Sequence, residues 1–263
     1  MYWHAAVWLV AVLFAWGLWL RLSGQDELWM QAVHAVPPTQ WGVWVWSCLT
    51  NLGLGWTLLI FVMACDRRDG ALISLLLPVF AMGSLITHGL KQALEVTRPA
   101  SSGLAHQLFM IGEPVFSANS TPSGHALTAG AAAMILAWWA KYSLTSALLA
   151  VAALLVSWSR VVVGAHWPAD VFLGLALGAC TVVLVLAICQ VPLVRKPLQG
   201  LRHKIASPSG QLVVACLEMA CAMALASTRT GYPQGWPAVL LLVSVALVSG
   251  LWRCHRVLRQ SSP

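Results

Sequence analysis

Long apolar runs alternate with short polar segments along most of this 263-residue chain. The runs approach the ~17–25 residues that a helix needs to cross a lipid bilayer. The pattern therefore predicts an all-α fold, a polytopic integral membrane helix bundle with about eight transmembrane helices. The expected helices cover residues 4–21, 49–65, 70–91, 122–141, 144–162, 168–190, 211–228 and 236–252.

One stretch departs from this pattern, because residues 24–48 mix polar side chains with several Trp. Such a composition predicts an amphipathic segment at the membrane interface, broken at Pro37 and Pro38. We see no internal repeat in the sequence. We therefore expect one membrane domain over residues 1–263, with a core at about 49–190 and an additional helix pair at about 211–252.

Composition supports the membrane class. Hydrophobic residues make up 59% of the chain and charged residues only 9%, whereas soluble domains carry about 25% charged residues. The 15 Trp fit this interpretation, because Trp collects at membrane interfaces. The seven Cys include no C-x-x-C pair, so we expect no metal site.

The formal net charge of +7 indicates orientation in the membrane rather than a nucleic-acid partner, because the basic residues lie in short loops. If the N-terminus is cytoplasmic, the inside loops hold Arg67, Arg68, Lys141, Arg195, Lys196, Arg202, Lys204, Arg253, Arg256 and Arg259. The outside then holds Arg21, Lys91, Arg98, Arg160 and Arg229. This distribution satisfies the positive-inside rule and predicts that both chain ends face the cytoplasm. We expect the segment from Arg195 to Lys204 to be an inside-facing basic loop.

Three polar clusters interrupt the apolar background, at residues 91–99, 121–125 and 159–170. In the eight-helix arrangement all three fall on the outer side. In the first cluster Lys91 and Arg98 are seven residues apart, about two helical turns, so we expect them to share one helix face that ends near Arg98. Two converging cations suit a phosphate group.

The second cluster predicts an anion site at a helix start. Thr121 can cap a helix whose first residue is Pro122. The free backbone N–H groups of Ser123 and Gly124 would then bind an anion, helped by the helix dipole. His125 follows directly and can deliver a proton.

The third cluster adds the cation of Arg160 and the pair His166 and Asp170, four residues apart. Pro168 is expected to start a helix, which places Asp170 in its first turn. The carboxylate can then reach the His166 ring, fix its tautomer and favour the imidazolium. An oriented imidazole is a competent nucleophile.

At these residues the chain resembles the type 2 phosphatidic acid phosphatase (PAP2) superfamily, in its membrane-bound bacterial lipid phosphatase and phosphotransferase branch. The family pattern reads K-x6-R-P, then P-S-G-H, then S-R-x5-H-x3-D. The matching positions are Lys91, Arg98, Pro99, Pro122, Ser123, Gly124, His125, Ser159, Arg160, His166 and Asp170.

The resemblance implies a six-helix core and a role for each matched residue. His166 would be the nucleophile, Asp170 would orient it, and His125 would be the general acid. The phosphate oxygens would be held by Lys91, Arg98, Ser123, Gly124 and Arg160, while Ser159 belongs to the motif without a clear role. No metal and no cofactor are implied. The compact chain and the resemblance favour a bacterial inner membrane, with the site facing the periplasm.

The function expected is hydrolysis of a lipid phosphate or diphosphate through a phosphohistidine intermediate. Transfer of the phosphate to an acceptor lipid such as lipid A uses the same intermediate and stays open. A non-enzymatic lipid transporter or binder is the third alternative. Undecaprenyl diphosphate, phosphatidylglycerol phosphate, phosphatidic acid and lipid A all remain open as substrates, as does the oligomeric state. Glu218, inside an apolar run, is a further functional suspect.

Overall fold

The computed structural model describes residues 2–66, 69–140 and 142–260, so Arg67, Arg68 and Lys141, predicted to lie in inside loops, fall outside the described residues. The predicted all-α fold is confirmed, because helices are the only regular elements in these ranges. The elements are α1 (Tyr2–Leu22), α2 (Gln25–Val33), α3 (Gln40–Asn51), α4 (Gly55–Cys65), α5 (Ala71–Leu94), η1 (Pro99–Ser101), η2 (Ala105–Gln107), α6 (Gly124–Ala140), α7 (Ser143–Val162), α8 (Pro168–Ile188), α9 (Pro192–Ala206), α10 (Pro208–Ser227), η3 (Pro233–Gly235) and α11 (Trp236–Gln260).

Not every predicted span is a single helix that is long enough, by itself, to cross a membrane. In the described residues, α5, α7, α8, α10 and α11 are long and apolar enough to cross a membrane. Two bent pairs, α1 with α2 and α3 with α4, raise the number to seven if each pair is one span. Helix α6 has 17 residues, at the short end of what a crossing needs. The integral membrane class stands, with fewer single helices than expected.

The predicted span 49–65 is wrong as a single helix. Helix α3 ends at Asn51, α4 begins at Gly55, and the two meet at a bend of 67°. The break brings Gly53 against the ring of His125, where a Cβ atom would come within 2.9 Å of the ring carbon Cδ2. Helix α3 reaches back to Gln40, into the stretch predicted to be interfacial. Pro37 and Pro38 lie between α2 and α3, so the predicted break there is confirmed.

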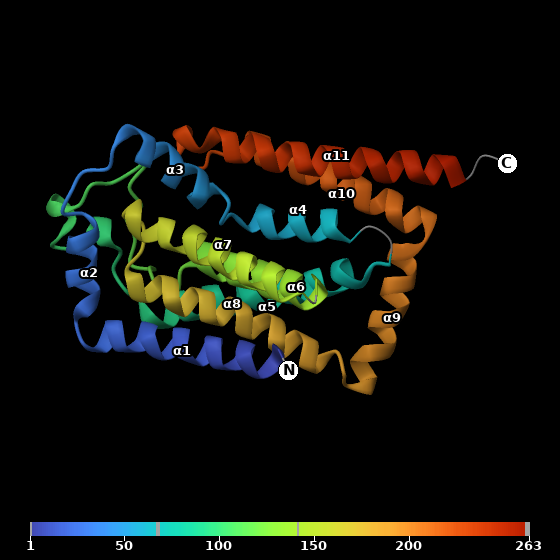
Figure 1. The fold of residues 1–263 in the computed structure, drawn as a ribbon, viewed down its shortest axis with the longest axis horizontal. Coiled ribbons are helices and arrows are strands. Elements are labelled where there is room, and N and C mark those ends of the chain that lie inside the picture. Colours follow the sequence, from blue (N-terminus) through green and yellow to red (C-terminus); the bar gives the residue numbers. More distant parts are fainter. Residues whose placement is uncertain (1, 67–68, 141, 261–263) are drawn as a thin grey trace.

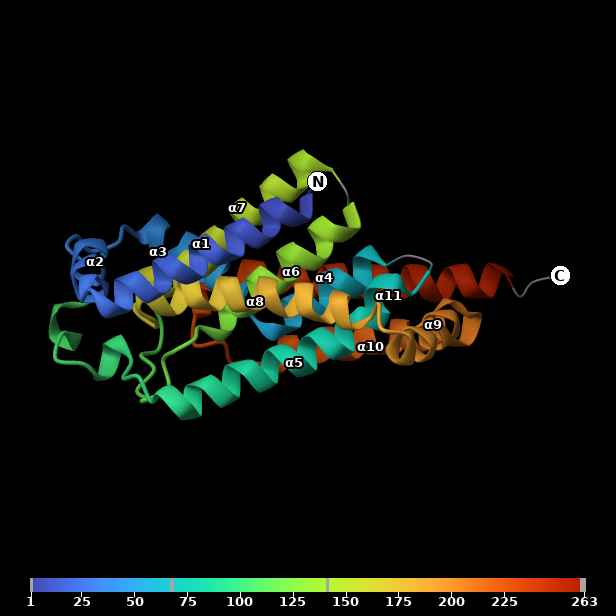
Figure 2. The ribbon, with the colours of Figure 1, turned by 90° about the horizontal axis from the view of Figure 1, so that it is seen from below.

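Helices α6 and α8 pack side by side at the centre, with α7 and α1 beside them (Figure 1, Figure 2). Glycine makes the close approach possible. A Cβ atom at Gly174 of α8 would lie 2.6 Å from the Ser123 carbonyl oxygen, and one at Gly130 of α6 would lie 2.5 Å from the Leu175 carbonyl oxygen. Small residues of this kind let membrane helices pack backbone to backbone. The start of α6 is thereby held against the start of α8.

The segment predicted as a basic loop is helix α9, which runs across one end of the bundle (Figure 1). None of its residues is buried, and Arg202 pairs with Asp69 at 2.7 Å. Pro192 begins the helix, and Val194, Leu198 and Ile205 are partly buried against the hydrophobic core. The loops between α5 and α6 lie at the opposite end of the bundle.

Glu218 has a structural partner. Arg253 of α11 donates from Nε to a Glu218 carboxylate oxygen at 3.1 Å, and both side chains are fully buried. Ser249 donates to the other Glu218 oxygen at 2.7 Å. Arg253 also donates to the Gln211 side chain at 2.5 Å and to the backbone carbonyls of Met63 and Asp66. This network joins the pair α10–α11 to the end of α4, so a structural role accounts for Glu218.

Candidate active site

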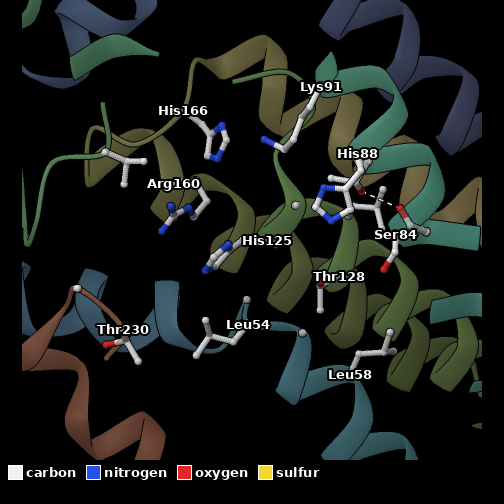
Figure 3. A pocket seen from close by; sticks show the side chains of 18 of the residues that line it. Leu54, Leu58, Ser84, His88, Lys91, His125, Thr128, Arg160, His166 and Thr230 are labelled. Carbon is white, nitrogen blue, oxygen red and sulfur yellow. Dashed lines mark hydrogen bonds between the residues drawn. The ribbon is translucent and has the colours of Figure 1, made fainter. Parts of the chain in front are cut away.

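The three polar clusters meet at one cavity of about 760 Å³ (Figure 3). Its lining includes six of the predicted site residues: Lys91, Arg98, Gly124, His125, Arg160 and His166. The remaining three, Ser123, Ser159 and Asp170, are fully buried behind this surface. The sequence clusters therefore share one location, which is what a common site requires.

His166 lies on the turn between α7 and α8, with its two ring nitrogens facing different groups. Nδ1 lies 3.5 Å from an Asp170 carboxylate oxygen and 3.4 Å from the Ser120 hydroxyl. Because a carboxylate only accepts hydrogen bonds, this contact favours the proton on Nδ1. Nε2 is then the unprotonated nitrogen, and it lies 3.3 Å from Nη1 of Arg98. The ring is thus presented as a neutral imidazole with its lone pair on the Arg98 side.

The protonation of His166 differs from the expected imidazolium. Burial lowers the pKa of the His166 imidazole to about 3; the Asp170 contact raises that pKa and the charge of Arg98 lowers it. The effect of Asp170 has the predicted direction, but burial outweighs it. A neutral imidazole at pH 7 is the form that can attack an electrophile.

Asp170 accepts hydrogen bonds from four protein groups besides its contact with His166. The Ser120 hydroxyl donates at 2.5 Å, the Trp167 backbone N–H at 3.0 Å, and the Thr121 hydroxyl donates to the other oxygen. That oxygen also receives Nη2 of Arg21 at 2.6 Å. A fully buried carboxylate with this many donors is held in one orientation.

Arg21 was missed as a site residue by sequence reasoning, which counted it only as an outside charge. It ends α1, 149 positions from Asp170, and also pairs with Asp26 at 3.2 Å. Asp26 in turn accepts from the backbone N–H of Ala169 at 2.7 Å, in the first turn of α8. The bent pair α1–α2 therefore clamps the helix start that carries Asp170. In the sequence, the only sign of this role of Arg21 is that a cation without an evident partner stands at the end of an apolar run.

The predicted geometry of the second cluster is partly wrong. Helix α6 begins at Gly124 rather than Pro122, and Thr121 bonds Asp170 instead of capping the helix. The backbone N–H of Ser123, expected to be free for an anion, donates to the Asp170 carbonyl at 3.0 Å. The Ser123 hydroxyl accepts from the Ala126 N–H at 3.4 Å. Close packing of α6 on α8 explains this, because it places the Ser123 N–H beside the Asp170 carbonyl.

The first cluster also differs in local structure. Helix α5 ends at Leu94, and Glu95 adopts a left-handed conformation with φ 46°, so Arg98 lies in a loop and not on the Lys91 helix face. The two cations converge nevertheless. Lys91 donates to the Asn119 carbonyl at 2.6 Å, and Arg98 donates to the Ala165 carbonyl at 2.9 Å. The loop after α5 brings Arg98 back over the cavity, an arrangement that helix periodicity could not predict.

Arg160, near the end of α7, is almost fully buried at the cavity. Its Nη1 donates to the Thr50 hydroxyl at 2.5 Å and to the Tyr232 hydroxyl at 3.0 Å. Ser159 beside it donates to the Val156 carbonyl within α7 at 2.5 Å, which is a helix-internal contact. We find no hydrogen-bond partner for the His125 ring among the described residues, and the ring borders the cavity beside Arg160.

The cavity also has an apolar part, and some of its lining comes from the loop between α10 and α11. Leu54 and Leu58 border it at α4, and Val79 and Phe80 border it along α5. The loop between α10 and α11 contributes Arg229, Thr230, Gly231 and Tyr232. In the described ranges no three His, Cys, Asp or Glu side chains come together as metal ligands do. The expectation of a metal-free site stays a prediction.

The segment that contains the three polar clusters is similar to a known protein family. The model of the PAP2 superfamily matches residues 72–192, the segment that holds every motif residue from Lys91 to Asp170. This match concerns residues 72–192 alone, which we call the PAP2 segment. No curated protein matches the chain significantly. Arg21, Thr50 and Tyr232 lie outside the PAP2 segment, so the contacts that these three residues make come from flanking helices.

Two solved structures are similar to the chain. The crystal structure of Aquifex aeolicus LpxE shares 24% identity with a TM-score of 0.52, over 61% of this chain and 93% of that one. The first transmembrane PAP2 type phosphatidylglycerolphosphate phosphatase from Bacillus subtilis shares 24% identity with a TM-score of 0.54, over 71% of this chain and 94% of that one. At this identity the likeness concerns the fold, and it agrees with a membrane PAP2 architecture.

Proposed function

We propose that this protein is a metal-independent membrane lipid phosphatase that works through a phosphohistidine on His166. The observation that carries the proposal is the His166 ring, which contacts the buried Asp170 and borders a cavity lined by Lys91, Arg98 and Arg160. A pure lipid binder or transporter needs cations for a phosphate. It does not need an oriented imidazole with a second His beside it.

In the proposed first step, the substrate phosphate lies among the three cations. The lone pair of His166 Nε2 attacks phosphorus and the bond to the lipid oxygen breaks. His125, which takes up a proton when the negatively charged phosphate enters the cavity, gives this proton to that oxygen. Asp170 stabilises the positive charge that develops on the His166 ring. Because charge spreads over the phosphate oxygens in the transition state, fixed cations contribute most of the rate acceleration.

In the second step, water attacks phosphorus and the bond to Nε2 breaks. His125 now takes a proton from the water, which restores both His residues and releases inorganic phosphate. The same intermediate would serve a phosphotransferase if an acceptor lipid replaced water.

A lipid substrate is supported by where the cavity lies. Its polar lining comes from helix ends, whereas Leu54, Leu58, Val79 and Phe80 line another part. A lipid phosphate could therefore place its phosphate among the cations and part of its tail against apolar side chains. Each buried methylene would contribute up to ~0.8 kcal/mol. One of the two similar structures is that of a phosphatidylglycerolphosphate phosphatase, which agrees with this class.

We also propose a cellular location and a domain organisation for this protein. The resemblance and the compact chain support a bacterial inner membrane location, and the charge distribution supports a cavity that faces the periplasm. We also propose that residues 1–263 act as one domain, because residues from α1, α3 and the α10–α11 loop contact the site residues of the core.

The decisive experiment measures phosphate release by detergent-purified protein. Undecaprenyl diphosphate, phosphatidylglycerol phosphate, phosphatidic acid and lipid A are compared, with and without an acceptor lipid. We expect His166→Ala to abolish release, and His203→Ala, on the exposed face of α9, to act as the matched control. No release from any lipid by the wild-type protein, or a His166→Ala variant that keeps a tenth of the rate, would contradict the proposal.

A further inference from the structure

The loop between α10 and α11 reaches the cavity although it lies outside the PAP2 segment. Residues 229–232 line the cavity beside Arg160, and Figure 3 shows Thr230 on the Arg160 and His125 side of the space. No role for the additional helix pair, α10 and α11, could be predicted from the sequence. Its loop therefore raises the question of what the pair contributes to the site.

The loop contacts the predicted site through Tyr232, which pairs with Arg160. The Tyr232 hydroxyl accepts from Arg160 Nη1 at 3.0 Å, and the guanidinium carbon lies 5.4 Å from the centre of the Tyr232 ring. Thr50 of α3 accepts from the same Nη1 at 2.5 Å. All three side chains are almost fully buried. Arg160 is thus held from one side by residues that its own helix does not supply.

These contacts leave a defined edge of the guanidinium available. Nη1 is occupied, whereas Nε of Arg160 is buried without a partner, and we find no acceptor for Nη2 among the described residues. The N–H bonds of Nε and Nη2 run parallel on one edge of the guanidinium plane. Such an edge matches two oxygens of one phosphate, which is the bidentate arrangement that makes Arg selective for phosphate.

Tyr232 can act as a firm support because its loop is fixed on two sides. The Gly231 carbonyl accepts from the Glu113 N–H at 2.9 Å, and the Tyr232 carbonyl accepts from the Gly235 N–H at 2.9 Å. Its ring packs on Gly112, where a Cβ atom would come within 2.6 Å of a ring carbon. Gly112 has φ 77°, which favours glycine independently of this contact. The loop cannot shift without disturbing the loop after α5.

We propose that Tyr232, together with Thr50, is a positioning residue that holds the free Nε–Nη2 edge of Arg160 toward the substrate phosphate. The additional helix pair α10–α11 thereby completes the phosphate site of the PAP2 core. This inference rests on the proposed phosphatase function, because it assigns a bound phosphate to Arg160.

The test uses Tyr232→Phe, which keeps the ring and removes only the hydroxyl. We expect kcat to fall about tenfold, equivalent to ~1.4 kcal/mol of lost transition-state stabilisation, with KM changed less than threefold. Charge on the phosphate oxygens is best matched in the transition state, so kcat should carry the effect. Tyr142→Phe, at the exposed start of α7, is the matched control and should leave both constants unchanged.

A double-mutant cycle separates positioning from general damage. In an Arg160→Lys background, Tyr232→Phe should cost less than twofold, because the group that Tyr232 orients has gone. Thr50→Val removes the other Nη1 acceptor and should resemble Tyr232→Phe, which provides a second variant if one of them folds poorly. Additive effects in the cycle, or Tyr232→Phe and Thr50→Val both within twofold of wild type, would overturn the inference while leaving the phosphatase assignment intact.

A wild-type protein that hydrolyses no lipid phosphate would overturn the proposed function instead. Orthovanadate binding then tests the positioning role directly, because five-coordinate vanadate resembles the phosphorus centre in the transition state rather than the bound substrate. We expect Tyr232→Phe to raise the vanadate Kd about tenfold relative to wild type. Equal Kd values for the two proteins would refute the inference.

Discussion

Replacing Arg253 by Met is expected to destabilise the protein while leaving the phosphate site chemically intact. Arg253 lies in the network that joins α11 to α10 and α4. Its hydrogen bonds go to Glu218, Gln211 and the Asp66 carbonyl, and none of these is a predicted site residue. Its guanidinium and the Glu218 carboxylate are both fully buried. Removing the cation therefore leaves a carboxylate in an apolar helix interface, with Ser249 as its only remaining side-chain donor among the described residues.

The magnitude follows from these contacts. Breaking a buried ion pair by removing one partner costs about 3–5 kcal/mol, because the remaining charge is unpaired. The carbonyls of Met63 and Asp66 and the Gln211 side chain also lose a donor, at about 1–3 kcal/mol for each group left unsatisfied. The apolar Met side chain offsets part of this loss. We expect a net destabilisation of at least ~3 kcal/mol.

The assay is denaturant unfolding of detergent-purified variants, followed by helical circular dichroism. Arg259→Met, which removes an exposed cation from the same helix, is the matched control and should change stability by less than ~0.5 kcal/mol. The double variant Glu218→Gln/Arg253→Met removes the unpaired charge and should recover at least ~1 kcal/mol. The reasoning fails if Arg253→Met costs less than ~1 kcal/mol, or if the double variant is no more stable than the single one.

Four further outcomes are expected. Arg21→Leu should lower kcat for lipid phosphate hydrolysis about tenfold or more, because Asp170 loses a charged donor at 2.6 Å; an unchanged rate would contradict the clamp. Because burial lowers the pKa of His166 to about 3, the ring stays neutral above that pH, and the pH profile of kcat/KM should show no His166 limb between pH 5 and 8. Activity should survive EDTA, and restoration by a divalent ion after complete loss would refute metal independence. Gly103→Cys should react with an impermeant thiol reagent from outside, and Gly200→Cys on α9 only after permeabilisation; both positions have open space for the side chain, and the reverse pattern would invert the topology.

The sequence by itself determined the class of the fold and the composition of the site. Apolar run length alone predicts membrane helices, because a helix surrounded by lipid must be apolar over its whole crossing. The order and spacing of Lys91, Arg98, His125, His166 and Asp170 predicted which side chains meet. These features are local, so they can be read along the chain.

Helix ends were predictable only in part. Helix α5 stops at Leu94 and α6 starts at Gly124, each a few residues from its expected position. The Ser123 N–H is occupied because α6 packs tightly on Gly174 of α8. Such choices depend on the neighbouring helix, which no local pattern describes.

The partners of the site residues were decided by tertiary structure alone. Arg21 reaches Asp170 across 149 positions, and Thr50 and Tyr232 reach Arg160 across 110 and 72 positions. In the sequence Arg21 was an interfacial charge, and Tyr232 belonged to a helix pair without a role. Hydrogen bonds act over about 3 Å, so only the packing of the helices decides which polar groups lie close enough to pair.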